Sequence, residues 1–531
     1  MMICKVTGSI VSTHKNTQLK GHKIMIVQPV DLTQKPSGPD LLAIDEVSAG
    51  VGDLVLVMKE GGGARIILKN KKIPIQAVIV GVIDDFHIPT HSHPGTFCSH
   101  TRFDMEKFIV EGGHSLKGTF YPAGNKNEAL PVVAACMLTE EPVILKNMPD
   151  IIDTRKMLEI AAAFGADVTQ IDKKTWKVHA KNIRTHEPDH QLASEIRGSF
   201  LFAGSMIGRH GKVSLPSPGG DKIGRRRLDT HILALEKLGA KMELGHKFYK
   251  MDAAKLAGQD IFLDEASVMA TENAVMAAVL AEGTTILNNA ASEPHVQGLC
   301  RMLVGMGARI SGIGSNLLVI EGVKKLHGCE HTISNDHIEI GSIIGLAAAT
   351  KSEILIKDTN PKDMRMILLV FQRLGIEVEI RGRDLFVSKD QSLEIHSDMD
   401  GAVPKIDDAP WPGFPADLSS IIVIAATQCK GMVLIFEKMF ESRLFFTDKL
   451  ITMGARIILC DPHRAVIHGP TPLHAELITS PDIRAGMALL IAALCAQGTS
   501  TMQNIKQLDR GYEHIDERLR ALGAHIQRVN E

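Results

Sequence analysis

Hydrophobic positions follow two different periods along this chain. Up to residue 86, apolar and β-branched residues recur in short runs, at Ile3–Val11, Lys23–Val30, Leu54–Met58, Ile66–Leu68 and Ile73–Ile83. Segments rich in glycine and proline separate these runs. Short β-branched runs between turn-forming segments are typical of strands. About five strands in so short a length predict a small closed all-β barrel.

From Met105 onward the pattern is helical and repeats. An apolar helical run ends in a hydrophobic residue, a glycine and usually an alanine. The glycine of this signature occurs at Gly165, Gly239, Gly307, Gly375, Gly454 and Gly523, in steps of 74, 68, 68, 79 and 69 residues. Glycine ends a helix readily because it adopts positive φ without penalty. Six units of similar length predict two lobes of three units, with the active site where the lobes meet.

A polar stretch, residues 87–104, separates the two patterns. Among its Pro, Ser, Thr and Gly residues it carries His87, His91, His93, Cys98 and His100. Imidazole and thiolate groups suit zinc, but this spacing matches no standard zinc finger. A flexible linker is the favoured interpretation, and a metal site is the alternative. Because Met105 stands where a separate enzyme could have begun, a further hypothesis is that the linker joins two once-separate reading frames.

Composition narrows the class of protein. The 531 residues predict roughly three domains. A net charge of -2 and only 4% aromatic residues disfavour a nucleic-acid binder. No apolar run reaches membrane-spanning length, and the N-terminus lacks a signal-peptide pattern. The eight cysteines form no CxxC pair, which is typical of a reducing compartment. We therefore expect a cytoplasmic protein without membrane or nucleic-acid partners.

One loop, residues 214–231, concentrates charge. Two prolines and the pair Gly219-Gly220 prevent regular structure there. The loop carries one carboxylate, Asp221, followed by the cations Lys222, Arg225, Arg226 and Arg227. An acid-bearing loop beside clustered arginines predicts a lid over an anionic substrate. A solvated surface turn is the alternative.

Polar side chains also precede or begin several expected apolar helices. Gly124–Pro131 places Lys126 and Asn127 at a helix N-terminus, a natural anion site, although a buried Lys–Glu pair would also explain the lysine. Arg197 precedes another apolar helix. Asp417 precedes a third, where a helix N-cap would account for it without any function.

Three arginines in the C-terminal half are each expected to begin or precede a helix: Arg443, Arg484 and Arg510. A cation at a helix N-terminus opposes the helix dipole, so stability does not explain these residues. A shared anionic ligand would explain them.

Taken together, these residues resemble the enolpyruvyl transferases over residues 105–531, and most closely the UDP-N-acetylglucosamine 1-carboxyvinyltransferase family. The stretches that carry the resemblance are Gly124–Asn127, Pro218–Gly224, Ser267–Thr271, Ala281–Thr284, Phe414–Asp417 and Asp509–Glu513. The resemblance implies an α/β fold of two inside-out lobes with three repeats each. Lobe I would be residues 126–333, and lobe II residues 105–125 with 334–531.

The activity that this resemblance implies is transfer of enolpyruvate from phosphoenolpyruvate to the 3-hydroxyl of UDP-N-acetylglucosamine, with release of phosphate. That reaction is the first committed step of peptidoglycan synthesis. It implies no cofactor and no metal ion. Lys126, Arg226 and Arg510 would hold the phosphate and carboxylate of phosphoenolpyruvate. Arg443 and Arg484 would support that region.

The remaining roles are implied in the same way. Asn127, Arg197 and Ser267-Val268 would line the side of the nucleotide sugar. Asp417 would accept the proton of the attacking hydroxyl or orient that hydroxyl. Asp221 would protonate the methylene carbon of phosphoenolpyruvate, which requires a carboxyl group that carries a proton in place.

Residues 1–86 resemble the bacterial-microcompartment vertex protein family. The matching stretches are Cys4–Thr13, Leu19–Lys23, Asp45–Gly52, Val57–Arg65 and Val78–Asp84. This family implies a small barrel that assembles into closed rings, typically pentamers, at the corners of a protein shell. The partners expected through this part are therefore further copies of the chain or shell proteins.

Two other functions stay open on the sequence alone. One is enolpyruvyl transfer to another acceptor such as shikimate 3-phosphate, which is disfavoured because Asn127 stands where that branch typically has serine. The other is a non-catalytic shell or assembly protein whose transferase part is inactive. An inactive transferase domain would not be expected to retain six dispersed cations and two acids.

The chain departs from the usual family pattern at the loop. The loop is two residues longer, at Ser217-Pro218, and Arg227 stands where proline is usual. Most members also carry cysteine where this chain has Asp221, and a carboxylate is a far poorer nucleophile toward an epoxide than a thiolate.

We therefore predict resistance to fosfomycin, which acts by alkylating that cysteine. Purified enzyme incubated with fosfomycin should keep its activity over time. Time-dependent covalent inactivation would contradict this prediction.

Overall fold

The computed structural model describes residues 2–10, 16–19, 22–31, 35–45, 47, 49–59, 68, 77–83, 106–221, 223–224, 226–245 and 248–530. The chain divides into two compact units, Met1–Thr101 and Arg102–Glu531. The expected linker, residues 87–104, lies outside the described residues, and so does its alternative interpretation as a metal site. No helix in the described part of the chain is long and apolar enough to cross a membrane.

The described strands of the first unit close into a barrel, as predicted. They are β1 (Met2–Ile10), β2 (Lys23–Pro29), β3 (Leu41–Asp45), β4 (Leu54–Lys59) and β5 (Ala77–Val82), joined in the order β1-β2-β3-β5-β4. A short 3-10 helix, η1 (Thr17–Leu19), precedes β2. Neighbours are antiparallel except β3 and β5, which are parallel. Aliphatic side chains such as Val6, Val27 and Val57 fill the interior.

The pattern missed one strand of this barrel. β3 is only five residues long and follows a proline- and glycine-rich segment, so it reads as part of a turn. Of the expected strand Ile66–Leu68, residues 66 and 67 lie outside the described residues. At the end of β3 the buried carboxylate of Asp45 accepts hydrogen bonds from the backbone of Val47 and Ala49, and Lys23 pairs with it at 3.1 Å. The stretches Leu19–Lys23 and Asp45–Gly52, which carry part of the family resemblance, are thus in contact.

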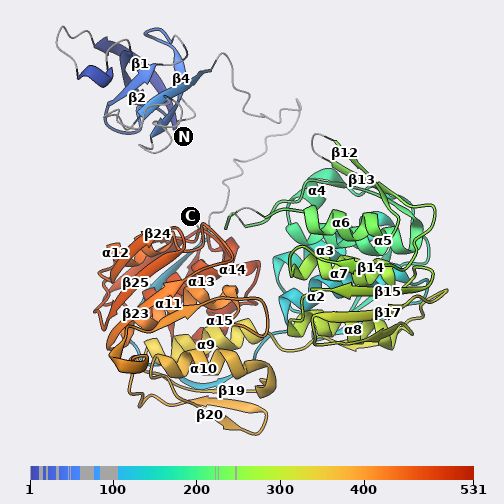
Figure 1. Ribbon diagram of the computed structural model, residues 1–531. Helices are drawn as coiled ribbons and strands as arrows, with labels where there is room; N and C mark the ends of the chain where they lie inside the picture. Colours follow the sequence, from blue (N-terminus) through green and yellow to red (C-terminus); the bar gives the residue numbers. More distant parts are fainter. Residues whose placement is uncertain are drawn as a thin grey trace, which may run out of the picture. The chain divides into compact units, whose positions relative to one another are not determined.

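In the described part of the second unit, the strands form six sheets (Figure 1). Three sheets surround one hydrophobic core, lobe I. The first sheet, in the order β18-β8-β10-β9, consists of β8 (Val143–Lys146), β9 (Asp167–Asp172), β10 (Thr175–His179) and β18 (Glu330–Thr332). The second, in the order β11-β13-β12, consists of β11 (Lys212–Pro216), β12 (Lys241–Leu244) and β13 (Phe248–Asp252). The third, in the order β14-β15-β17-β16, consists of β14 (Asp260–Phe262), β15 (Thr284–Asn288), β16 (Arg309–Ser311) and β17 (Leu317–Glu321).

The other three sheets surround a second core, lobe II. The first of these sheets, in the order β20-β21-β19-β7, consists of β7 (Lys117–Phe120), β19 (Glu353–Ile356), β20 (Val378–Arg381) and β21 (Asp384–Val387). The second, in the order β22-β23-β25-β24, consists of β22 (Lys405–Asp407), β23 (Gly431–Phe436), β24 (Arg456–Asp461) and β25 (Arg464–Gly469). The third, in the order β26-β27-β6-β28, consists of β6 (Lys107–Glu111), β26 (Leu477–Thr479), β27 (Thr499–Gln503) and β28 (His525–Val529).

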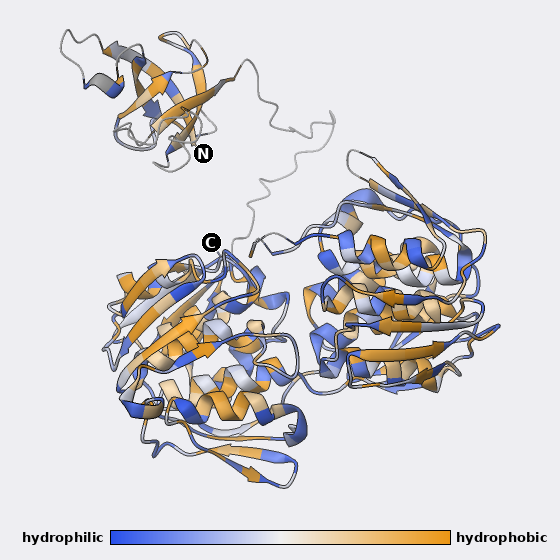
Figure 2. Ribbon diagram, viewed as in Figure 1, coloured by the Kyte–Doolittle hydropathy of each residue, from blue (hydrophilic) through white to orange (hydrophobic). Residues whose placement is uncertain are grey.

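Helices fill the interior of each lobe. In lobe I these are α2 (Lys126–Ala135), α5 (Phe202–His210) and α7 (Val268–Ala278), which contact one another; in lobe II they are α9 (His337–Ala349), α11 (Ser419–Gln428) and α13 (Ile483–Cys495). All residues of α9 are buried, because sheets and helices cover every side of it. Helices that are apolar all round are stable only in such an interior. Figure 2 shows the hydrophobic residues gathered on these helices and on the strands.

A second helix in each repeat ends shortly before the predicted glycine. These helices are α3 (Ile152–Phe164), α6 (Asp229–Lys237), α8 (Pro294–Gly305), α10 (Arg365–Arg373), α12 (Thr447–Thr452) and α15 (Ile515–Arg520). The six glycines that follow them all have positive φ, between 73° and 115°. The sixfold repeat is therefore confirmed, with each glycine turning a helix into the next strand. The shorter helices are α4 (His190–Ser194), α14 (Lys506–Asp509), η2 (Cys136–Leu138), η3 (Arg197–Leu201), η4 (Pro361–Met364), η5 (Met399–Gly401) and η6 (Ala416–Leu418).

The chain crosses between the lobes twice, and the two crossings run side by side. The backbone of Asn125 donates to Ser334 at 2.7 Å, and that of Asp336 donates to Ala123 at 2.9 Å. Gly124 and Asn335 form an antiparallel bridge. Helix α2 begins directly after the first crossing and α9 directly after the second. The first turns of both helices are thereby placed where the lobes meet.

Candidate active site

A cavity of about 350 Å³ is lined by residues of both lobes. Every site residue predicted from the sequence lines it. These are Lys126, Asn127, Arg197, Asp221, Arg226, Ser267, Val268, Asp417, Arg443, Arg484 and Arg510. Their positions span nearly 400 residues of sequence, and the fold brings them to one place.

A buried carboxylate that the sequence did not single out links cations of the two lobes. Asp153, in the first turn of α3, is 3% exposed. Its two oxygens contact Nζ of Lys126 at 2.8 Å and Nε of Arg510 at 3.0 Å. Burial alone would raise the pKa of Asp153, but Lys126 and Arg510 outweigh burial and hold the pKa below its usual range.

This network corrects one alternative from the sequence. Lys126 pairs with Asp153 and not with a glutamate. The nearby Glu128 instead contacts His331 at 2.8 Å. Asp153 escaped notice because an acid in the first turn of a helix is already explained by the helix dipole.

Asp417 is held by two arginines. Its oxygens accept hydrogen bonds from Nη2 of Arg443 at 3.0 Å and from Nε of Arg484 at 3.1 Å. The N-cap of α11 is Leu418, with no side-chain capping bond, so the N-cap interpretation of Asp417 is wrong. Burial would raise the pKa of Asp417, but Arg484 and Arg443 outweigh it and hold that pKa well below its usual range.

The helix-dipole argument for the three C-terminal arginines holds only in part. Arg484 does lie in the first turn of α13, where the side chain of Asp482 caps the helix. Arg443 precedes α12 by four residues. Arg510 is the C-cap of α14, an end where a cation is favourable, so its position needed no ligand to explain it. Carboxylate contacts, not helix ends, hold Arg443 and Arg510 in the cavity.

The charged loop contacts lobe II at several points. The backbone of Ser442 donates to the carbonyl of Ile223 at 3.1 Å, and Ile223 is buried. Asp221 forms an ion pair with Arg510. At Gly224 there is no room for a side chain, because a Cβ would lie 2.3 Å from the carboxylate of Glu441. These contacts favour the lid over the solvated surface turn. Lys222 and Arg225 lie outside the described residues.

Arg226 is a cation of the loop that has no acid paired with it among the described residues. It lines the cavity and forms no ion pair with any residue in the described part of the chain. Burial lowers its pKa, and the neighbouring Arg443 and Arg510 lower it further, against the opposing effect of Asp221 and Asp417. A half-buried guanidinium near two others favours an anion in the cavity.

The residues expected on the nucleotide side also line the cavity. Arg197 begins η3, and its Nη2 donates to the carbonyl of Arg227 at 3.0 Å. Burial and then the proximity of Arg226 lower the pKa of Arg197 to about 10. Ser267 is the N-cap of α7 without a side-chain capping bond, and Asn127 lies in the first turn of α2.

A cluster of buried polar groups also lines the cavity, and the sequence analysis missed it. Oε1 of Glu272, Oε2 of Glu293 and Nδ1 of His295 are buried without a hydrogen-bond partner among the described residues. Burial and then Glu293 raise the pKa of Glu272, while burial and then His337 lower the pKa of His295 to about 3. The imidazole is therefore neutral near pH 7, and burial disfavours the charged form of both carboxyl groups. Glu272 lies within an apolar helix, where periodicity gives no signal for a site.

Behind Arg443 lies Glu437, which is fully buried. Its Oε2 is 4.0 Å from Nε of Arg443. Burial raises the pKa of Glu437 to about 8, although Arg443 opposes that rise. Near pH 7 this carboxyl group is mostly protonated and therefore does not neutralise Arg443. The positive charge of Arg443 acts on Asp417 and on the cavity.

Similarity to known proteins agrees with this geometry. The family described as EPSP synthase (3-phosphoshikimate 1-carboxyvinyltransferase) matches residues 110–519. A UDP-N-acetylglucosamine 1-carboxyvinyltransferase of Treponema denticola is 56% identical over 423 residues, which are 80% of this chain and 99% of that protein. One of Bradyrhizobium diazoefficiens is 56% identical over 425 residues, 80% of this chain and 98% of that protein. The chain belongs to the UDP-N-acetylglucosamine 1-carboxyvinyltransferase family.

Solved structures show that this carboxyvinyltransferase has the expected enolpyruvyl transferase fold. The enolpyruvyl transferase NikO from Streptomyces tendae superposes with a TM-score of 0.71 at 24% identity, covering 81% of this chain and 100% of that chain. An EPSP synthase from Acinetobacter baumannii gives a TM-score of 0.62 at 17% identity, covering 80% and 100%. The family described as Ethanolamine utilisation protein EutN/carboxysome matches residues 1–84, which confirms the resemblance of the barrel.

The raised pKa of Glu437 predicts a pH-dependent stability. Between the ordinary pKa of glutamate and about 8, the folded protein keeps a proton that the unfolded chain releases, so stability falls as pH rises through this window. Glu437→Gln removes this dependence. Its Tm relative to the parent protein should therefore be higher at pH 8.5 than at pH 5.5 by about 10 °C, the shift that roughly 3 kcal/mol produces in a lobe of this size.

Differential scanning calorimetry across this pH range measures the effect. The control is Glu517→Gln, which changes an exposed glutamate of α15. A difference in Tm between Glu437→Gln and the parent protein that stays constant with pH would contradict the prediction.

Proposed function

We propose that the protein transfers enolpyruvate from phosphoenolpyruvate to the 3-hydroxyl of UDP-N-acetylglucosamine and releases inorganic phosphate. This reaction is the first committed step of peptidoglycan synthesis. The observation that carries the proposal is the convergence of eleven residues with matching chemistry on one cavity, in a chain 56% identical to proteins named for this activity. We take lobe I to be residues 126–333 and lobe II to be residues 105–125 with 334–531, since the sheets and cores divide in that way.

Phosphoenolpyruvate would bind at the cationic side of the cavity. Arg226 would meet its phosphate, since this guanidinium is half-buried and forms no ion pair among the described residues. Lys126 and Arg510 would reach the phosphate and carboxylate by giving up part of their contact with Asp153. Arg443 and Arg484 would add positive potential from behind Asp417. A trianionic ligand justifies so many cations in one buried place.

Asp221 would act as the general acid. It would transfer a proton to the methylene carbon of phosphoenolpyruvate, and the oxygen of the sugar hydroxyl would form a bond to the resulting cationic C2 while the hydroxyl proton passes to solvent. In the structure, Asp221 accepts a hydrogen bond from Arg510, so the carboxylate oxygen that must carry the proton is engaged. Arg510 would turn to phosphoenolpyruvate when that substrate binds, which frees Asp221 to take up a proton. Transfer of a proton from the new methyl group back to the Asp221 carboxylate, with cleavage of the bond between C2 and the phosphate oxygen, then forms the enolpyruvyl product and releases inorganic phosphate.

Asp417 would orient the sugar hydroxyl. A carboxylate whose pKa is held well below its usual range is a weak base. Arg443 and Arg484 hold the Asp417 carboxylate in a fixed position. From that position the carboxylate would accept a hydrogen bond from the attacking hydroxyl. Arg197, Asn127 and Ser267-Val268 would contact the diphosphate and uridine portions. The loop around Ile223, which bridges to lobe II, would exclude water from the reacting atoms.

Phosphate release tests this function. The purified full-length protein should release phosphate from phosphoenolpyruvate only when UDP-N-acetylglucosamine is present. Asp221→Asn should lower kcat by about 10²–10⁴, because the amide cannot deliver the proton. Asp167→Asn, which changes an exposed carboxylate of β9, should leave kcat unchanged.

Other outcomes would overturn the proposal. Release that requires shikimate 3-phosphate instead would assign a different acceptor, and no release from folded protein would favour the assembly role. Asp221→Cys supplies a further check on the loop. It should keep activity and become subject to time-dependent inactivation by fosfomycin, unlike the parent protein.

We also propose that residues 1–84 assemble the chain into closed rings, with five copies to a ring. The closed barrel and the match to a carboxysome-related family support this assignment. A ring would hold five transferase units, either at a shell or simply close together.

Light scattering after size-exclusion chromatography measures the assembly. Five copies of the 57.7 kDa chain would give about 290 kDa. Residues 102–531 alone, a compact unit to which the relatives correspond in length, should be monomeric. A monomeric full-length protein would contradict the ring.

A further inference from the structure

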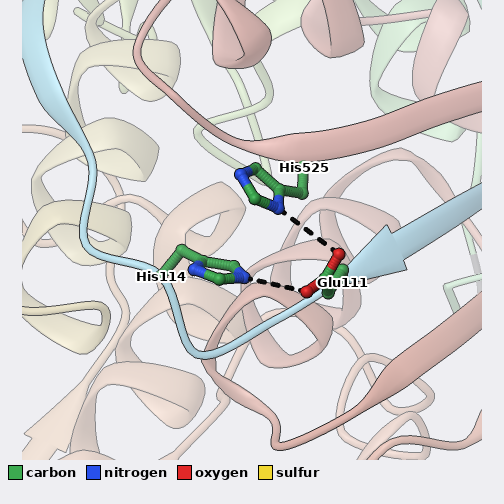
Figure 3. A group of neighbouring side chains, drawn as sticks. All are labelled: Glu111, His114 and His525. Atoms are coloured by element: carbon green, nitrogen blue, oxygen red, sulfur yellow. Dashed lines mark hydrogen bonds and ion pairs between the residues drawn. The ribbon is translucent and has the colours of Figure 1, made fainter.

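Two histidines and a glutamate from opposite ends of the transferase sequence converge at the edge of one sheet (Figure 3). Glu111 ends β6, His114 follows three residues later, and His525 begins β28 as the cross-strand partner of Glu111. Nε2 of His114 lies 3.2 Å from Oε1 of Glu111. Nδ1 of His525 lies 3.4 Å from Oε2 of the same carboxylate. None of these residues lines the cavity described above.

The backbone holds this arrangement firmly. The amides of Gly112 and Gly113 donate to the carbonyls of Gly498 and Leu494, at 3.1 and 2.9 Å. A Cβ at position 112 would lie 2.2 Å from the carbonyl oxygen of Ala493, so only glycine fits there. The tight turn therefore brings His114 back over the sheet edge, where its ring centroid is 4.1 Å from that of His525.

Two imidazoles share one carboxylate here, whereas a single imidazole contacts the acid in the pair of His190 and Glu187 at 3.0 Å. Both oxygens of Glu111 are engaged, and the two rings are in contact with each other. One ligand atom from each of the three residues lies within 4.8 Å of the other two. Imidazole nitrogen and carboxylate oxygen are both ligand atoms of zinc.

We propose that Glu111, His114 and His525 bind one divalent transition-metal ion of the zinc class. Donor atoms around a tetrahedral zinc with bonds of about 2.1 Å lie about 3.4 Å apart, close to the two nitrogen–oxygen separations found here. Two imidazoles and one carboxylate leave a fourth position to water. The three side chains are 41–56% exposed, so the ion exchanges with solvent.

The ion would tie the first strand of the transferase unit to its last. β6 and β28 lie side by side in one sheet, but about 410 residues separate Glu111 from His525 along the chain. A ligand that binds only the folded pairing stabilises it by mass action. This stabilising effect does not depend on the proposed transferase reaction.

Zinc binding to untagged full-length protein, stripped with a chelator, tests the site. Isothermal titration should show one zinc equivalent more for the parent protein than for the variant His114→Gln/His525→Gln. Zinc at a hundredfold its Kd should raise the Tm of the parent protein by about 5 °C and that of the variant by clearly less. The comparison subtracts any zinc held by the histidines and cysteine of residues 87–104.

The matched control is His190→Gln, which removes a histidine–glutamate pair with a single imidazole. It should keep the zinc equivalents and the Tm shift of the parent protein. Phosphate release by each variant verifies that it is folded, and Glu111→Gln and His525→Gln alone serve if the double variant is not. Equal zinc equivalents and equal Tm shifts in the parent protein and the folded variants would overturn the proposal.

Discussion

The contact on which the site depends is the one between Asp153 and its two cations. Lys126 comes from lobe I and Arg510 from lobe II, and both are drawn to the same buried carboxylate. Without Asp153 the two cations would repel each other inside the protein, where charge separation is costly. With it, the two lobes are joined by charge at the place where an anionic substrate must enter. Asp153 therefore holds the two cations together before a substrate binds. The substrate would replace part of their ionic contacts with Asp153 by ionic contacts with itself.

Charged side chains in this site contact one another in series. Asp417 contacts Arg443 and Arg484, all three line the cavity, and Arg443 in turn contacts Glu437. Because Glu437 is mostly protonated near neutral pH, it packs against Arg443 without neutralising it. The buried polar groups of Glu272, Glu293 and His295 also line the cavity. One cavity thus combines a cationic region with buried polar groups in which burial disfavours charge.

The sequence predicted those features that have local physical causes. Six glycines mark the repeats because ending a helix in a left-handed turn is a local requirement, and β-branched runs mark most barrel strands for a similar reason. Positions that depend on distant partners were harder. Asp153 looked like a helix-dipole residue, and Glu272 was concealed in an apolar helix. Asp417 and Arg510 were predicted as site residues, but the helix-end arguments did not reveal their partners, since carboxylate–arginine pairs across the fold hold both.

The membership of β6 and β7 in lobe II has a consequence for synthesis on the ribosome. These strands are made before all of lobe I, yet β7 pairs with β19 and β6 pairs with β27 and β28. Lobe I can fold while its neighbour is still incomplete, and β6 must wait with unpaired backbone until almost the last residues emerge. The barrel, complete by Val82, has no such delay. Nascent chains could thus associate through their barrels while their catalytic portions are still being translated.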